Sequence, residues 1–168
     1  MLSILYGEMA LASSRRIFEK IYADYNKRVY VSPDPLQFLY DYEKIRDREV
    51  VGLIASSLAY GRVAQILKSV GRVLDCLGDA PAEFLKKVER KDLEEKLEGF
   101  VHRFTDSSDM VDFLCCIGNV LNTYGSVENL FLSHYKGETW QAMRGFTTSF
   151  LDCGGRGATF MMPDPAKG

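Results

Sequence analysis

The side chains best suited to bind a ligand in this sequence are basic groups near the ends of predicted helices. Guanidinium and ammonium groups suit phosphate oxygens, because they carry positive charge and several hydrogen-bond donors. The candidate residues are Arg48, Arg62, Lys68, His102 and Arg103. Their types and positions suggest phosphate contacts, and with them nucleic-acid binding.

The same residues also suit an ordinary protein surface. Arg62 and Lys68 lie on the polar side of a predicted helix that also carries Asp75. Mixed-sign charge of this kind is the default for a solvated helix face. The residue pattern by itself favours this second interpretation.

The segment "FVHRF" at 100–104 places a histidine and an arginine between two phenylalanines. The two polar side chains could reach a ligand or a phosphate. Alternatively, Phe100 and Phe104 anchor the core, while His102 and Arg103 cap carbonyl groups or face water. The second interpretation is again favoured.

Standard catalytic spacings are absent. The sequence has no Gly-x-x-x-x-Gly-Lys-Ser/Thr loop, no Gly-x-Ser-x-Gly elbow and no His-Glu-x-x-His pair. None of its cysteines forms a Cys-x-x-Cys pair, so we interpret them as reduced thiols. They are Cys76, Cys115, Cys116 and Cys153. We therefore predict no catalytic residue, no metal site and no cofactor.

The charge balance excludes a general attraction to polyanions. The 168 residues include 21 basic and 23 acidic side chains, for a net charge of −2. Any nucleic-acid site must therefore be a local patch. The N-terminal segment "MLSILYGEMALASSRR" has no basic region before its short apolar run, so we predict no membrane span. Reduced thiols and this N-terminus together predict a cytoplasmic protein.

Helical periodicity dominates, and no segment alternates as a strand would. The sequence predicts an all-α fold, in a single domain over residues 1–168 that is incomplete at its C-terminus. In the first half of the chain, helices are expected over 14–26, from an N-cap at residue 34, over 47–60 and over 62–77. In the second half they are expected over 81–100, with a break near 90, and over 110–124, 127–135 and 140–153. Residues 154–168 are expected to form a loop. Predicted N-caps are Asp34, Asp47, Ser108 or Asp109, Ser126 and Thr139, and predicted helix-ending glycines are Gly61, Gly78 and Gly125.

Three segments carry a family resemblance. They are "DREVVGLIASSLAYGR" at 47–62, "FVHR" at 100–103 and "PDPAKG" at 163–168. Together they resemble a bacterial family known as domain of unknown function 2400, over most of the chain from about Asp34. That family is distantly similar to the helix-hairpin-helix DNA glycosylases, which flip a damaged base out of the duplex and cut its glycosidic bond. The resemblance implies an orthogonal multi-helix bundle like the N-terminal part of the endonuclease III-like fold, and a role in DNA repair.

The sequence departs from the glycosylases at two kinds of position. Leu58 stands where those enzymes carry a glutamine, and Gly61 stands where they carry an aspartate. In relatives, the segment matching "PDPAKG" continues into a Ser-x-x-Lys-Arg helix and a later Leu-Asp-x-His segment, whereas this sequence stops at Gly168. We therefore expect a C-terminally truncated chain without a catalytic residue.

Two main functions stay open at this point, besides a small-molecule site between helices around Tyr60 and His102. The chain is expected to be the N-terminal helical portion of a glycosylase-like protein that binds DNA weakly and performs no catalysis by itself. Alternatively, it is a structural or protein-interaction domain without a nucleic-acid role. An apolar face left exposed by the missing half would also let the chain self-associate.

Overall fold

The computed structural model describes the backbone of residues 2–152, 161 and 162, and the side chains of residues 14–152, 161 and 162. The chain divides into two compact units, Met1–Pro33 and Asp34–Gly168, where the sequence had predicted a single domain. Apart from Met161 and Met162, the loop predicted at 154–168 lies outside the described residues.

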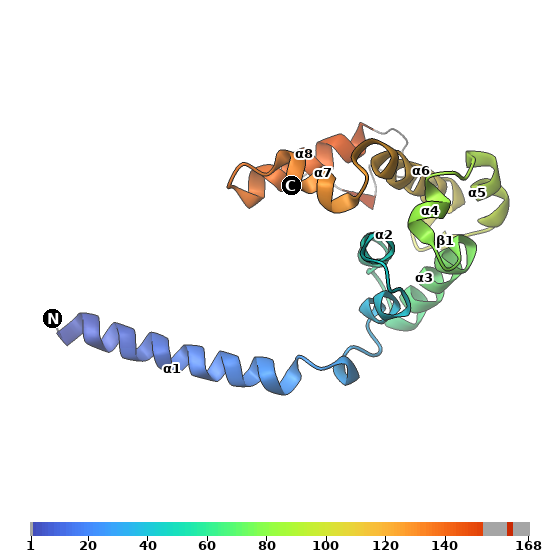
Figure 1. Ribbon diagram of the computed structural model, residues 1–168. Coiled ribbons are helices and arrows are strands. Elements are labelled where there is room, and N and C mark those ends of the chain that lie inside the picture. The colour runs from blue at the N-terminus through green and yellow to red at the C-terminus, as the bar shows by residue number, and fades with distance from the viewer. Residues whose placement is uncertain (1, 153–160, 163–168) are drawn as a thin grey trace. The chain divides into compact units, whose positions relative to one another are not determined.

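The elements of both units are mostly helical, which confirms the predicted all-α class (Figure 1). Unit 1 contains α1 (Leu2–Tyr25) and the 3₁₀ helix η1 (Arg28–Tyr30). Unit 2 contains η2 (Pro35–Asp41), α2 (Ile45–Ser57), α3 (Val63–Leu77), α4 (Pro81–Leu85), α5 (Arg90–Lys96), β1 (Val101–His102), β2 (Thr105–Asp106), α6 (Ser107–Tyr124), α7 (Val127–His134) and α8 (Thr139–Leu151).

Local capping chemistry explains several of these boundaries. The Asp34 carboxylate accepts a hydrogen bond from the Leu36 amide at 2.8 Å and starts η2, as predicted. Gly125 ends α6 in the left-handed conformation, and the next residue, Ser126, caps α7 through the Asn129 amide. These caps were readable from sequence because each bond spans only a few residues.

The start of α6 differs from the prediction. Its N-cap is Asp106, whose carboxylate accepts from the Asp109 amide at 3.0 Å. The Asp109 side chain in turn accepts from the Asp106 amide at 3.2 Å, which completes a reciprocal capping box. Asp106 also ends β2, so one residue joins the hairpin rigidly to the helix.

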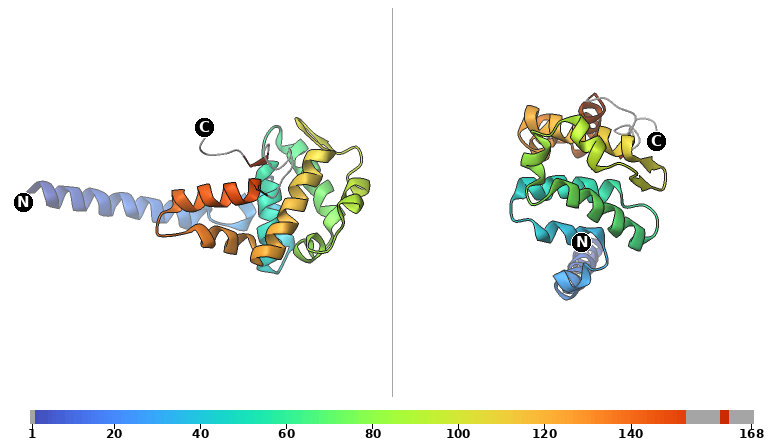
Figure 2. Two further views of the ribbon diagram at one scale, coloured as in Figure 1. Left: turned by 90° about the horizontal axis from the view of Figure 1, so that it is seen from above. Right: turned by 90° about the vertical axis from the view of Figure 1, so that its right-hand side faces the viewer.

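The core of unit 2 is built around α6. This helix packs against α4, α5, α7 and α8 and against strand β2. Figure 2 shows α7 and α8 side by side at one end of α6. The largest fully buried side chains come from α2, α5, α6, α7, α8 and the short segments beside them, and they are Ile54, Leu58, Leu93, Leu97, Phe100, Met110, Phe113, Leu114, Ile117, Leu121, Leu130 and Phe150.

Three consecutive side chains near the start of α2 connect it to other elements. The Asp47 carboxylate is buried and accepts a hydrogen bond from the Ala82 amide in α4 at 2.9 Å. Arg48 Nε donates to the Tyr42 carbonyl at the end of η2 at 2.6 Å. The Glu49 carboxylate accepts from the amides of Val127 and Glu128 in α7 at 2.8 and 3.1 Å. Asp47 was predicted to start its own helix, but it instead caps another one.

Some residues expected in the core are exposed. Phe104 was one of two predicted anchors in "FVHRF", but it is 72% exposed, whereas Phe100 is buried. On α8, Trp140 and Met143 are exposed while Phe146 and Phe150 are buried. The predicted Thr139 cap is also wrong, because Glu138 holds the N-cap position and Thr139 is the first helical residue.

Replacing Asp47 tests the capping contact between α2 and α4. We expect Asp47→Ala to lower the free energy of unfolding by about 1–3 kcal/mol, because the buried Ala82 amide loses its acceptor. The exposed carboxylate Glu43, just before α2, offers the matched control Glu43→Ala, for which we expect little change. Urea unfolding of both variants measures the difference, and equal losses would contradict the assigned role.

Candidate nucleic-acid interface

The hairpin formed by β1 and β2 rests on a buried histidine. The strands pair antiparallel, with Val101 opposite Asp106 and His102 opposite Thr105. The His102 side chain is fully buried. Its Nδ1 lies 2.9 Å from Ser69 Oγ on α3, and its Nε2 lies 3.1 Å from the Tyr60 carbonyl. The ring therefore fixes the hairpin to the segment that joins α2 and α3.

Tyr60 closes the same cluster from the other side. Its hydroxyl donates to the His102 carbonyl at 3.1 Å and is hydrogen-bonded to Thr105 Oγ1. The Tyr60 and His102 rings meet edge-on with centroids 4.7 Å apart, and Thr105 Oγ1 contacts Met161 Sδ at 3.6 Å. In the described part of the chain, every fully buried side-chain nitrogen and oxygen has a hydrogen-bond partner. This polar cluster is satisfied, and its bonds hold the hairpin in place.

The hairpin turn holds Arg103 against a glycine. Arg103 has a positive φ of 55°, and Gly61 has a φ of 109°. A Cβ added to Gly61 would lie 2.9 Å from Arg103 Cδ, so the arginine stem occupies the space that a side chain would need. The Arg103 guanidinium carbon lies 5.5 Å from the centroid of the Phe104 ring, a cation–π contact at the hairpin tip.

A basic and aromatic surface results, which we call the hairpin surface. It consists of Arg62, Lys68, Arg103 and Phe104, all of them exposed. Arg62 follows Gly61 and is the N-cap residue of α3. Lys68 adjoins Ser69, which is bonded to His102 beneath the hairpin. These cations can reach phosphate oxygens, and Phe104 offers a ring on which a base can stack.

The other two predicted phosphate contacts lie elsewhere. His102 is fully buried, and both of its ring nitrogens already have partners, so it supports the hairpin surface and is not part of it. Arg48 lies in the first turn of α2, whereas Arg62 follows the opposite end of that helix. At 1.5 Å per residue, the helix alone separates them by roughly 14 Å.

Arg72 has a structural role that its sequence position did not reveal. Neither Arg72 nor Ser69, which is buried, was among the candidate residues. The Arg72 guanidinium donates to the carbonyls of Glu98 and Gly99 and lies 5.7 Å from the Phe100 ring centroid. It therefore fixes the segment that enters β1 against α3.

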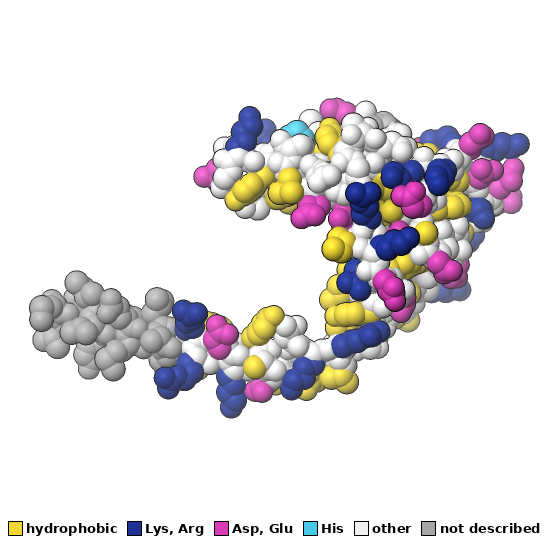
Figure 3. All heavy atoms as spheres, in the orientation of Figure 1, with side chains coloured by type: hydrophobic (Ala, Val, Ile, Leu, Met, Phe, Trp, Pro, Cys, Tyr) yellow, Lys and Arg dark blue, Asp and Glu magenta, His cyan; other side chains and the backbone are white. Residues whose placement is uncertain are grey.

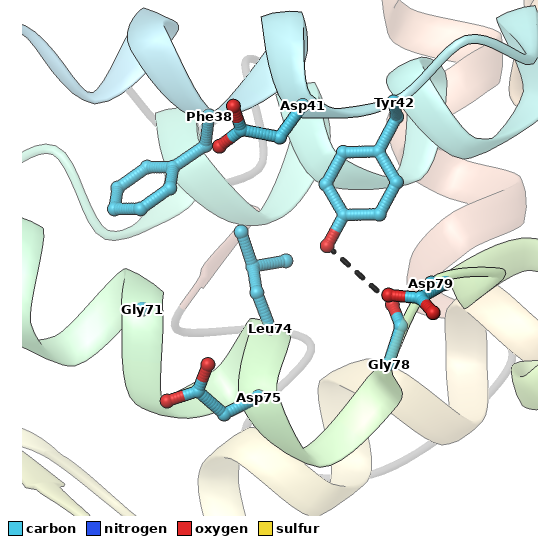
Figure 4. Close-up of a pocket in the computed structure, with 8 residues that line it drawn as sticks. All are labelled: Phe38, Asp41, Tyr42, Gly71, Leu74, Asp75, Gly78 and Asp79. Atoms are coloured by element: carbon cyan, nitrogen blue, oxygen red, sulfur yellow. Dashed lines mark hydrogen bonds between the residues drawn. The ribbon is translucent and has the colours of Figure 1, made fainter.

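An acidic pocket of about 340 Å³ lies between η2 and α3 (Figure 4). Phe38, Tyr42 and Leu74 provide apolar surface, and three carboxylates surround it, from Asp41, Asp75 and Asp79. Burial raises the pKa of the Tyr42 phenol, and the negative charges of Asp41 and Asp79 raise it further. The negative potential of this pocket disfavours phosphate, so the hairpin surface does not continue onto it.

The thiols of the described region are consistent with core packing. Burial raises the pKa of both Cys76 and Cys115, which disfavours the reactive thiolate form. Cys116 is buried in the core. Within the residues that the structure describes, no group of three or more His, Cys, Asp or Glu side chains could hold a metal ion. Among those same residues, no helix combines the length and apolar character needed to span a bilayer.

The fold and its hairpin surface define a helical domain that carries a short, rigidly seated β-hairpin. The chain belongs to the family described as protein of unknown function (DUF2400), whose model matches residues 34–168. This matched range coincides with unit 2 of the structure. No curated protein and no solved structure matches the chain.

Replacing Gly61 tests whether it makes room for Arg103. We expect Gly61→Ala to lower the free energy of unfolding by about 1 kcal/mol more than Gly137→Ala. Both glycines have a positive φ, but no atom lies within 4 Å of a Cβ built at Gly137. Chemical denaturation measures the two losses, and identical values would show that the Arg103 stem does not occupy this space.

The acidic pocket leads us to expect that Tyr42 loses its proton at a higher pH than an ordinary tyrosine does. The alkaline difference titration between wild type and Tyr42→Phe should reveal a phenol with a pKa above the ordinary 10.0. Asp41→Asn should lower that pKa, because one of the raising charges is removed, whereas Asp92→Asn on α5 should leave it unchanged. Since the pKa is raised on folding, the neutral phenol stabilises the fold below pH 10, and this contribution is lost as the pH rises through the folded value. A Tyr42 pKa at or below 10.0 would contradict the assignment.

Proposed function

We propose that this chain is a nucleic-acid-binding helical domain of a glycosylase-like protein and performs no catalysis by itself. The observation that supports it best is the hairpin surface, where Arg62, Lys68, Arg103 and Phe104 are all exposed and the Arg103 guanidinium lies against the Phe104 ring. Cations for phosphates and an aromatic ring for a base are the two components that single-stranded and distorted nucleic acids require.

The support beneath this surface strengthens the proposal. Arg103 and Phe104 follow the buried His102, whose hydrogen bonds reach Ser69 and Tyr60. The Phe104 ring and the Arg103 guanidinium beside it are therefore held at the tip of a well-supported turn, where a ligand can reach both. The distant similarity of the family to the helix-hairpin-helix DNA glycosylases makes DNA the proposed partner.

The limited number of cations makes the expected binding weak. Three phosphate contacts on duplex DNA predict a log–log salt dependence with a slope of about −2.7. The acidic pocket and the net charge of −2 add no long-range attraction. A partly unpaired site should bind more tightly than a perfect duplex, because an unstacked base is free to meet Phe104.

Fluorescence anisotropy with a duplex, a mismatched duplex and a single strand tests the proposal at low salt. We expect Arg103→Gln to weaken binding to all three, since one phosphate contact is lost. The salt slope should fall by about 0.9 on the duplexes and by about 0.7 on the single strand. Phe104→Ala should weaken binding mainly to the mismatched and single-stranded probes, by about 1–3 kcal/mol.

The matched control is Arg46→Gln, at the far end of α2. It removes the same charge from an exposed side chain and should not change affinity by more than a small factor. Equal effects of the Arg46 and Arg103 substitutions would contradict the assigned surface. A chain that binds none of the three probes at low salt would overturn the proposal.

A protein-interaction domain is the second candidate, and the end of unit 2 favours it. Leu132 and Tyr135 at the end of α7 are exposed, as are Trp140 and Met143 at the start of α8. These two helices pack together, and the four residues flank the connection between them in the sequence. Failure of nucleic-acid binding would make this surface the site to pursue.

A further inference from the structure

Unit 1 exposes a stripe of large apolar side chains, which we call the α1 stripe. Its residues recur at three- and four-residue spacings and therefore share one face of α1. They are Ile17, Phe18, Ile21, Tyr22 and Tyr25, each between 49% and 68% exposed. Figure 3 shows hydrophobic side chains among lysines and arginines on the part of unit 1 next to the grey atoms.

The 3₁₀ helix η1 continues this apolar surface. Val29 is 75% exposed and Tyr30 is 59% exposed. The Tyr30 ring lies against Tyr25, with centroids 5.6 Å apart. Every described side chain from residue 14 to residue 30 is exposed, so unit 1 has no core of its own in this region.

Helix energetics make an uncovered α1 improbable in water. An isolated helix of this kind is marginal, because most helical stability in proteins comes from packing an apolar face. Its sequence adds no N-terminal acidic or C-terminal basic residues that would favour the helix dipole. The α1 stripe therefore needs a covering surface if the helix is to persist.

The charges beside the α1 stripe indicate what that surface is. At 100° per residue, Arg15 and Glu19 lie along one edge of the stripe, and Lys20 and Asp24 lie along the other. Arg15 and Glu19 approach each other at 3.7 Å. Each edge thus offers one base and one acid, so a second copy meets opposite signs at both edges. An anionic membrane would instead favour a uniformly basic polar face.

The area of the stripe is sufficient for such a pair. Five side chains of this size, each about half exposed or more, offer roughly 500 Å² of apolar surface. Two copies would bury about 1,000 Å² together, which is the size at which specific association begins. We propose that this chain forms a homodimer in which the α1 stripes of two copies pack against each other. This does not rest on the proposed function, because no residue of the hairpin surface takes part.

Analytical ultracentrifugation of the full chain tests the dimer. We expect wild type to sediment as a dimer and Phe18→Glu to sediment as a monomer, because two buried carboxylates would face each other. Ala23→Glu adds the same charge on the opposite face of α1, so this variant should remain dimeric. Tyr22→Ala should raise the dissociation constant by at least about tenfold. Alanine is the best helix former, so loss of helix cannot explain that result.

Several outcomes would overturn the proposal. One is a wild-type monomer at every accessible concentration, and another is a Phe18→Glu variant that stays dimeric. Flotation of the wild type with phosphatidylglycerol vesicles in place of dimerisation would assign the stripe to a membrane surface. A further one is a monomer whose melting temperature is lowered by the Phe18→Glu substitution but not by Ala23→Glu. That result would instead place the stripe against unit 2 of its own chain.

Discussion

The packing of unit 2 depends on two carboxylates near the start of α2 that accept hydrogen bonds from the amides of other helices. Asp47 binds the first turn of α4, and Glu49 binds the first turn of α7. The free amides at a helix N-terminus are the strongest partners a buried carboxylate can find without a cation. Arg48, between them, holds the end of η2. One turn of helix therefore sets the positions of three other elements around the core.

The hairpin surface depends on a second set of bonds, formed by buried and half-buried polar groups. His102, Ser69, Tyr60 and Thr105 satisfy one another beneath the hairpin, so the chain reverses at Arg103 with little freedom. A buried polar cluster of this kind specifies one arrangement, because any other would leave polar atoms without partners. The positive φ of Arg103 persists because the atoms around it fix the turn.

The net charge of the chain is close to zero, but the chain carries two surfaces of opposite sign. The hairpin surface is basic, whereas the pocket between η2 and α3 is bordered by Asp41, Asp75 and Asp79. Both include residues of α3, which presents Lys68 on one and Asp75 on the other. A net charge of −2 therefore says little about where a polyanion would bind.

The sequence by itself determined the all-α class and several helix ends, because apolar spacing and the caps at Asp34, Gly125 and Ser126 act over a few residues. It misplaced the end of α2, which stops at Ser57 and not at Gly61. It also identified Arg62 and Arg103 as candidate phosphate-binding residues. Only the tertiary structure decided that His102 is buried beneath the hairpin and that Arg48 belongs to a helix junction. The first outcome depends on the bond from His102 to Ser69, more than thirty positions away. The second depends on the tertiary arrangement that brings the Arg48 side chain to the Tyr42 carbonyl. Local spacing carries no information about such partners, since they meet only when the core has formed.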